Sequence, residues 1–173
     1  GNTNGNLGNG SEQPSTLLRR VFGLDTVEQL VAGRNHVCAR LADATVTCWG
    51  RNSSGQLGNA DADRRQQNEP VVVPQLTDVT ALAAGNHHTC AVRNDGRVWC
   101  WGYNEFGALG DGSVEDRLAP VQTLMTAARE VAAGAHTCAV KQDGSVWCWG
   151  YNGYGAVGNG QIADVVSVPA RVT

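Results

Sequence analysis

Three cysteine pairs, each with a histidine nearby, are the residues of this sequence best suited to chemistry. The pairs are Cys38/Cys48, Cys90/Cys100 and Cys138/Cys148, and the histidines are His36, His88 and His136, each two residues before the first cysteine of its pair. Such a set could form a disulfide, bind zinc through a histidine and two thiolates, or supply a thiol nucleophile activated by an imidazole.

The disulfide is the chemistry that the spacing favours. Six cysteines allow about 15 pairings, but each sequence repeat carries its own pair, which selects one pairing. Each bond would close a short loop and stabilise the fold by about 3 kcal/mol on the chain-entropy estimate. Disulfides persist in oxidising compartments. We therefore expect three disulfides and an extracellular, periplasmic or cell-surface location.

The metal and enzyme alternatives are weaker. The three histidine–cysteine sets lie in separate repeats, and each lacks a fourth zinc ligand. Every thiol has a twin with the same histidine, whereas a catalytic thiol is normally distinct. We expect no catalytic residue, no metal and no cofactor. We expect the repeated histidines to be buried or half-buried and bonded to the backbone of a neighbouring loop. His87, which occurs in one copy, is expected to be exposed.

The segment around the second cysteine of each pair recurs along the chain. It reads VWCWGYNEFGALG at 98–110, VWCWGYNGYGAVG at 146–158 and VTCWGRNSSGQLG at 46–58, with a shortened copy, NTNGNLG, at 2–8. A period of about 50 residues indicates one structural unit used repeatedly. The sequence thus predicts a single repeat array over 1–173. Its parts are a partial unit at 1–20, hairpin units centred on 27–58, 79–110 and 129–158, and a partial unit at 159–173.

Each unit is predicted to contain a β-hairpin. The turn Asn94-Asp95-Gly96 separates two segments rich in Val, Thr, Trp and Cys, and symmetric pairing about Asp95 sets Cys90 opposite Cys100. Both faces of this hairpin are apolar, so both need cover. Four-stranded sheets stacked radially provide it. The expected fold is all-β, a partial β-propeller with three complete four-stranded blades plus an incomplete one.

The prolines and one alanine carry further structural expectations. Pro70, Pro120 and Pro169 precede short apolar segments, and we expect each proline at the first residue of a strand, where it costs no ladder bond. Ala44 stands where the later hairpins have Gly96 and Gly144. A left-handed conformation at Ala44 would cost about 1 kcal/mol, so this first hairpin is expected to be degraded or differently packed.

The pattern AAGxHTCAV…DGxVWCWGxNxxGxLG resembles the repeat of the regulator of chromosome condensation family, over essentially the whole chain. The resemblance implies a β-propeller, commonly of seven blades. The paired cysteines resemble those of secreted or surface-exposed bacterial members of the family. The family's activities reside in loops that cannot be matched residue by residue, so none is transferred to this chain.

A binding surface is expected in the loops that follow the last hairpin strand. The tryptophans suit packing between blades better than sugar stacking. The candidate surface residues are Arg51, Tyr103, Phe106, Tyr151 and Tyr154. Arg64 and Arg65 suit an acidic partner, although a solvated loop explains them equally well.

The composition limits the classes of partner that the chain is expected to bind. The net charge of −3 argues against nucleic-acid binding, and no apolar run approaches the roughly 18 residues that span a bilayer. Three blades are too few to close a ring, so we expect a fragment of a longer chain with self-association through open blade faces. The expected function is a secreted or cell-surface binding scaffold for an unidentified protein partner. Alternatives are a carbohydrate-binding propeller and a purely structural module of a larger surface protein.

Overall fold

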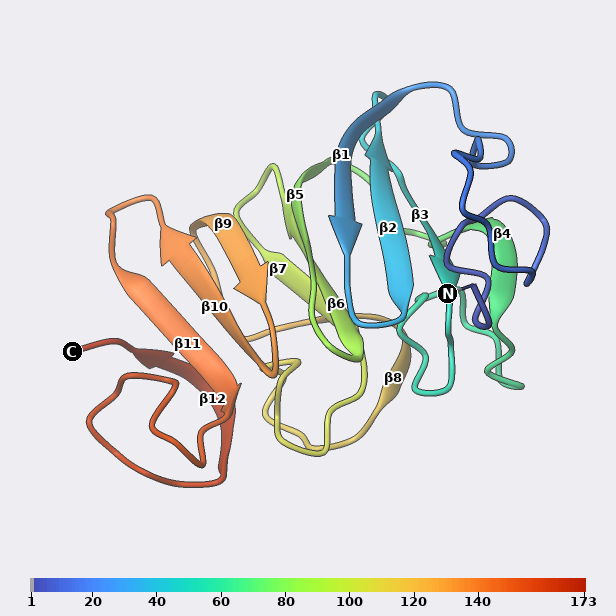
Figure 1. The fold of residues 1–173 in the computed structure, drawn as a ribbon. Helices are drawn as coiled ribbons and strands as arrows, with labels where there is room; N and C mark the ends of the chain where they lie inside the picture. The colour runs from blue at the N-terminus through green and yellow to red at the C-terminus, as the bar shows by residue number, and fades with distance from the viewer. Residues whose placement is uncertain (1) are drawn as a thin grey trace.

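Twelve β-strands make up the regular secondary structure of residues 2–173, the part of the chain that the computed structural model describes (Figure 1). Gly1, included above in the partial unit 1–20, lies outside the described residues. The strands form three four-stranded antiparallel sheets, stacked side by side in chain order, with the two termini at opposite ends of the array. The predicted all-β partial propeller is confirmed.

Each sheet uses consecutive strands. The first sheet contains β1 (Val27–Ala32), β2 (His36–Leu41), β3 (Val46–Gly50) and β4 (Gln67–Val72). The second contains β5 (Val79–Ala84), β6 (His88–Arg93), β7 (Val98–Gly102) and β8 (Arg117–Gln122). The third contains β9 (Ala128–Ala133), β10 (His136–Lys141), β11 (Val146–Tyr151) and β12 (Val165–Arg171). Residues 159–173, expected above as a further partial unit, thus supply the outer strand of the third sheet.

The central hairpin of each sheet has the predicted register. Cys90 pairs with Cys100 and Val92 with Val98 across β6 and β7, and the other two hairpins repeat this pairing. Directly opposed positions on neighbouring strands bring the two cysteine side chains close together. The structure has disulfides Cys38–Cys48, Cys90–Cys100 and Cys138–Cys148, with Cα–Cα distances of 4.1, 4.1 and 4.0 Å.

The two faces of each hairpin pack against different neighbours. In the interface between the first two sheets, Cys38 and Cys48 of the first sheet lie in one buried cluster with Trp101 of the second. In the next interface, Cys90 and Cys100 of the second sheet lie with Trp149 of the third. The cysteine face of one sheet therefore packs on the tryptophan face of the next, which explains why both faces of the hairpins are apolar.

The prolines lie inside strands rather than at their first residues. Pro70, Pro120 and Pro169 fall within β4, β8 and β12, each the last strand of its sheet, and each beside a shift in register with the preceding strand. An outer strand has one row of backbone groups without a ladder partner, and a bulge frees others, so proline sacrifices no bond there.

Residues 2–26 form no strand, but their first segment behaves as the loop of an incomplete unit. The indole Nε1 of Trp49 donates a 3.0 Å hydrogen bond to the carbonyl oxygen of Asn6. In the complete units, Trp101 and Trp149 make the same bond to loop residues Gln56 and Ala108. The partial copy at the start of the chain thus caps the first sheet.

The first hairpin keeps the shape of the others at a conformational cost. Ala44 has a φ of +61°, where the later turns have glycine. We predict that Ala44→Gly raises the free energy of unfolding by about 1 kcal/mol, because glycine adopts the left-handed region without steric penalty. Urea denaturation would measure the change.

Ala42 is the control, since it lies in the same turn and is absent from the positive-φ residues. Ala42→Gly should lower stability slightly, because glycine there only adds freedom to the unfolded chain. Equal effects of the two substitutions would show that backbone strain at Ala44 is not the cause.

Candidate functional site

Two kinds of loop meet at one end of the sheet array. The turn between the first two strands of a sheet lies beside the loop that leaves the third strand. Backbone bonds join them: Arg51 N donates to Asn35 O over 2.8 Å, and Tyr103 N donates to His87 O over 3.0 Å. In the first two sheets, the residue after the Trp-Gly pair is thereby held next to the turn that lies 16 positions earlier in the sequence.

A buried asparagine stabilises each of these loops from within. Asn104 is fully buried, and its Oδ1 accepts a 2.9 Å bond from Leu109 N while its Nδ2 donates to Ser113 O and Asp111. Asn2, Asn52 and Asn152 accept the corresponding bond from the backbone five residues later. The recurrent asparagines are therefore structural, and they fix the loop backbone that displays the aromatic side chains.

Aromatic side chains of the second and third sheets form a continuous row across this end. Ring centroids are 6.2 Å apart for His87–Tyr103 and for Tyr103–Phe106, 5.1 Å for Phe106–Tyr151 and 6.1 Å for Tyr151–Tyr154, each pair edge to face. Edge-to-face packing is a favourable aromatic geometry. The row crosses from one sheet to the next between Phe106 and Tyr151, and Tyr154 at its end is 89% exposed.

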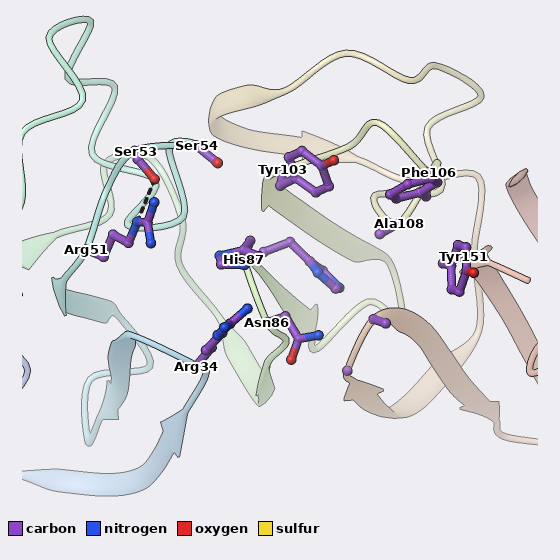
Figure 2. Close-up of a pocket in the computed structure, with 13 residues that line it drawn as sticks. Arg34, Arg51, Ser53, Ser54, Asn86, His87, Tyr103, Phe106, Ala108 and Tyr151 are labelled. Atoms are coloured by element: carbon purple, nitrogen blue, oxygen red, sulfur yellow. Dashed lines mark hydrogen bonds between the residues drawn. The ribbon is translucent and has the colours of Figure 1, made fainter. Parts of the chain in front are cut away.

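The row borders a hollow of about 560 Å³. Tyr103, Phe106 and Tyr151 lie on one side of it, and Arg34 and Arg51 on the other (Figure 2). Because the first-sheet loop has Arg51 and Ser54 where the later loops have aromatic residues, the hollow is aromatic at one end and cationic at the other.

The charges at this end have identifiable effects on titration. Partial burial, and then the positive charges of Arg51 and Arg34, lower the pKa of His87. The Tyr103 hydroxyl donates to the Glu105 carboxylate, and this bond is the main cause that raises the pKa of Tyr103 to about 12. At neutral pH, then, the phenol is protonated and the positive charge in the hollow comes from the two guanidiniums.

Two of the three repeated histidines, His36 and His88, join neighbouring sheets. His36 Nε2 lies 2.9 Å from the Thr89 hydroxyl of the next sheet, and Thr89 donates to the Gln56 carbonyl oxygen over 2.9 Å. His88 and Thr137 repeat the contact at 2.8 Å, with Thr137 donating to Ala108 O. Since each hydroxyl proton is given to a carbonyl, the Nε2 atom must carry the proton given to the threonine. The histidine reaches the loop backbone through this threonine hydroxyl rather than by the direct bond expected above.

Neither a free thiol nor a metal-binding cluster is present in the part of the chain described. All six cysteines are in disulfides. Among residues 2–173, no group of three or more His, Cys, Asp or Glu side chains is placed to hold a metal ion. Within the same residues there is also no helix long and apolar enough to cross a membrane.

The structure brings most of the expected binding residues together and separates two. Arg51, Tyr103, Phe106 and Tyr151 line the hollow, and Tyr154 extends the row beyond it. Arg64 lies outside the hollow, where it donates to the Ser53 carbonyl oxygen and pairs with Asp116 at 3.4 Å. Arg65 pairs with Asp63.

Sequence reasoning missed the residues that the turns between the first two strands of a sheet contribute to the hollow. Arg34, Asn86 and His87 lie in the turns that precede β2 and β6. His87, expected to be exposed, is half-buried against Tyr103. The signal was available in the hairpin register, because His88 opposite Gly102 places His87 beside Tyr103.

Comparison with known proteins finds relatives over about two thirds to three quarters of the chain. The ultraviolet-B receptor UVR8 of Arabidopsis thaliana is 31% identical over 126 residues, which cover 72% of this chain and 28% of UVR8. Protein pim1 of Schizosaccharomyces pombe is 34% identical over 130 residues, 68% of this chain and 24% of pim1. The probable E3 ubiquitin-protein ligase HERC3 of Homo sapiens is 32% identical over 133 residues, 75% of this chain and 13% of HERC3. The chain thus corresponds to less than a third of these relatives.

Solved structures match the whole fold. Yeast RCC1 (Prp20), in its complex with Kap60, superposes with a TM-score of 0.86 at 27% identity, over 100% of this chain and 43% of that protein. Human WBSCR16 superposes with a TM-score of 0.81 at 25% identity, over 99% of this chain and 46% of that protein.

Family models of the repeat match the same units that carry the three sheets. One model of the regulator of chromosome condensation (RCC1) repeat matches residues 43–92, 95–140 and 143–173, and a second matches 27–56, 79–108 and 129–156. With most of its length covered by these repeats, the chain belongs to the regulator of chromosome condensation (RCC1) repeat family.

Proposed function

We propose that this chain is a non-enzymatic protein-binding part of a secreted or cell-surface protein, and that it binds through the loop end that carries the aromatic row. The observation that supports this function is the continuous row from His87 to Tyr154, which lies beside an open hollow. Tyrosine and phenylalanine offer large contact areas at a small loss of side-chain entropy, and aromatic residues are enriched in protein interfaces.

The relatives agree with protein binding as the general activity. Yeast RCC1 (Prp20) has been crystallised bound to Kap60, and its binding to Gsp1p and histones has been described. HERC3 is named as a probable ubiquitin ligase, but this chain corresponds to only 13% of it. We extend to this chain the general property of binding proteins and none of those particular partners.

A phage-displayed peptide library and a glycan array, screened in parallel, test the proposal. The wild type should enrich a defined set of peptides, and the double variant Tyr151→Ser/Tyr154→Ser should lose it. The control is Val72→Ser, since Val72 is 67% exposed on β4 and lies outside the aromatic row and the hollow. Enrichment of glycans alone would favour the carbohydrate-binding alternative, and enrichment of neither would favour a purely structural module.

The secreted location rests on the three disulfides. The first two pairs are fully buried, and the third has Cys148 buried and Cys138 partly exposed. Such bonds form in oxidising compartments. The paired cysteines also support assignment to the secreted bacterial variety of the family. Thiol counting on denatured protein taken from its native cell should find no free thiol, and six free thiols would contradict this location.

The open faces of the first and third sheets are proposed to bind a second copy of the chain. Leu30 of β1 is 61% exposed and Val146 of β11 is 39% exposed, whereas both faces of the second sheet are covered by its neighbours. The cysteine face of the third sheet, around Val146, would then pack on the part of another first sheet around Leu30 that the segment covering Trp49 leaves exposed. Size-exclusion chromatography with light scattering should show an oligomer, and a monomer at all concentrations would contradict it.

A further inference from the structure

We infer that the hollow between Arg34 and Tyr151 binds an extended acidic peptide segment whose carboxylates contact the two arginines and whose apolar side chains lie along the aromatic row. This inference rests on the proposed protein-binding function and narrows it to one chemical class of partner. It follows from the charge of the hollow, from the hydrogen-bonding capacity of its cationic end and from the spacing of its rings.

Two guanidiniums of the hollow are available to a ligand. Arg34 and Arg51 are both exposed, and neither is among the ion pairs formed by the described residues. Arg51 is held in place by a 2.8 Å bond from its Nε to the Ser53 hydroxyl, which leaves its terminal nitrogens free (Figure 2). A guanidinium presents paired donors that match the two oxygens of a carboxylate.

Among residues 2–173, no carboxylate lines the hollow and competes for its cationic end. None of the residues that line the hollow is aspartate or glutamate. The nearby Glu105 accepts the Tyr103 hydroxyl, and Asp116 accepts from Asn104 N at 2.9 Å and from Arg64. The local charge is therefore positive although the whole chain carries −3. Such a hollow attracts anions through its positive electrostatic potential and through direct bonds from the two guanidiniums.

The spacing of the rings suits an extended chain. Successive centroids lie 5.1 to 6.2 Å apart. Alternate side chains of a β-strand, which point the same way, lie roughly 6.6 Å apart. A peptide laid along the row would thus place one apolar side chain near each ring. Asn86, which also lines the hollow, offers a side-chain amide to the peptide backbone.

The experiment measures binding of two labelled peptides to the full chain by fluorescence anisotropy. Both peptides alternate polar and apolar residues, with glutamate at the polar positions of one and glutamine in the other. The wild type should bind the glutamate peptide about tenfold more tightly, because each arginine adds a charge-assisted bond. Arg34→Gln and Arg51→Gln should each remove most of this preference, and Tyr151→Ser should weaken both peptides to a similar extent.

Arg171→Gln is the matched control, since Arg171 is exposed, belongs to none of the ion pairs of the described residues and lies on β12 outside the hollow. It should leave the preference intact. Equal binding of the two peptides by the wild type, no binding of either, or an equal loss with Arg171→Gln would each overturn the inference. So would an oligonucleotide that competes better than the glutamate peptide.

The peptide library separates the two proposals. If the library enriches peptides without an acidic bias and Tyr151→Ser/Tyr154→Ser loses them, the protein-binding function stands and the acidic specificity is wrong. If nothing is enriched, both are wrong.

Discussion

Replacing Trp101 with alanine should lower the free energy of unfolding by about 4 kcal/mol, the typical cost of removing a fully buried tryptophan. The Trp101 side chain has no exposed surface and lies in the cluster that joins the first two sheets. Its indole Nε1 also donates a 3.0 Å bond to the Gln56 carbonyl oxygen, which the substitution would break. Urea denaturation followed by circular dichroism would measure the loss.

The cost should be high because the neighbouring loop cannot fill the space. A Cβ atom on Gly58 would lie 2.6 Å from the indole Nε1, so the loop backbone packs directly on the ring. Gly58 has a φ of +66°, and the loop is further held by Asn52. A backbone fixed in this way relaxes little, and the residual cavity adds to the loss.

Trp99→Ala is the matched control. Trp99 is on the same strand and packs against the same cluster, but it is only partly buried and its Nε1 has no hydrogen-bond partner within the described residues. Trp99→Ala should lower the free energy of unfolding by less than half as much as Trp101→Ala. Equal losses would show that the inter-sheet bond and the tight loop contact contribute nothing.

Lowering the pH from 6.5 to 4.5 should destabilise the fold by about 1 kcal/mol per pH unit for each of two buried histidines. Burial lowers the pKa of His36 to about 4 and that of His88 to about 3, and repulsion from neighbouring histidines adds to both effects. In the unfolded chain these groups have pKa values near 6.5. Between the two values the unfolded state binds more protons, so stability is complete above pH 6.5 and falls as the pH drops.

The acid sensitivity has its physical cause in the buried histidine–threonine contacts between neighbouring sheets. His36 already donates its Nε2 proton to Thr89, and its Nδ1 is buried without a hydrogen-bond partner among the described residues. A second proton would therefore place an uncompensated charge in the interface. Lowered pKa values of Asp43, Asp111 and Asp143 add acid sensitivity only at lower pH, near and below the usual carboxyl range.

Thermal denaturation across this pH range would measure the slope in the wild type and in His88→Gln. The variant should be less stable at pH 7 but should lose about half of the slope. His87→Gln is the control, because His87 is half-buried and takes no part in the histidine–threonine contacts between sheets. This substitution should change the slope much less. If the variant fails to fold, the wild-type slope alone decides, since a flat profile from pH 6.5 to 4.5 would contradict the prediction.

Much of the fold could be predicted because its determinants are local and repeated. The turn at Gly96 has the required left-handed φ of +75° and sets the register that pairs Cys90 with Cys100. Because the same sequence segment recurs, the prediction of one hairpin applies to all three units. The prediction for the prolines was wrong, because whether a strand begins at Pro70 or already runs through it with a bulge depends on its neighbour in the sheet.

The candidate site was predictable only in part. Tyr103 and Tyr151 could be placed in loops by their position after Trp-Gly, but their approach to Phe106 depends on how one sheet packs against the next. Arg51 and Arg64 were both candidate binding residues, yet Arg64 pairs with Asp116 and lies outside the hollow. Burial and ion pairing are properties of the packed structure, so charge alone could not distinguish these two arginines.

By itself, the sequence determined the repeat, which follows from recurrence of one segment about every 50 residues. It also determined the hairpins and the cysteine pairs, which follow from residue spacing within about a dozen positions and from turn chemistry that acts locally. Only the tertiary structure decided that the His36 imidazole meets Thr89, and that Arg34, Arg51 and Tyr151 surround one hollow. Those contacts join different sheets, and their geometry depends on how whole faces pack against one another rather than on any local pattern.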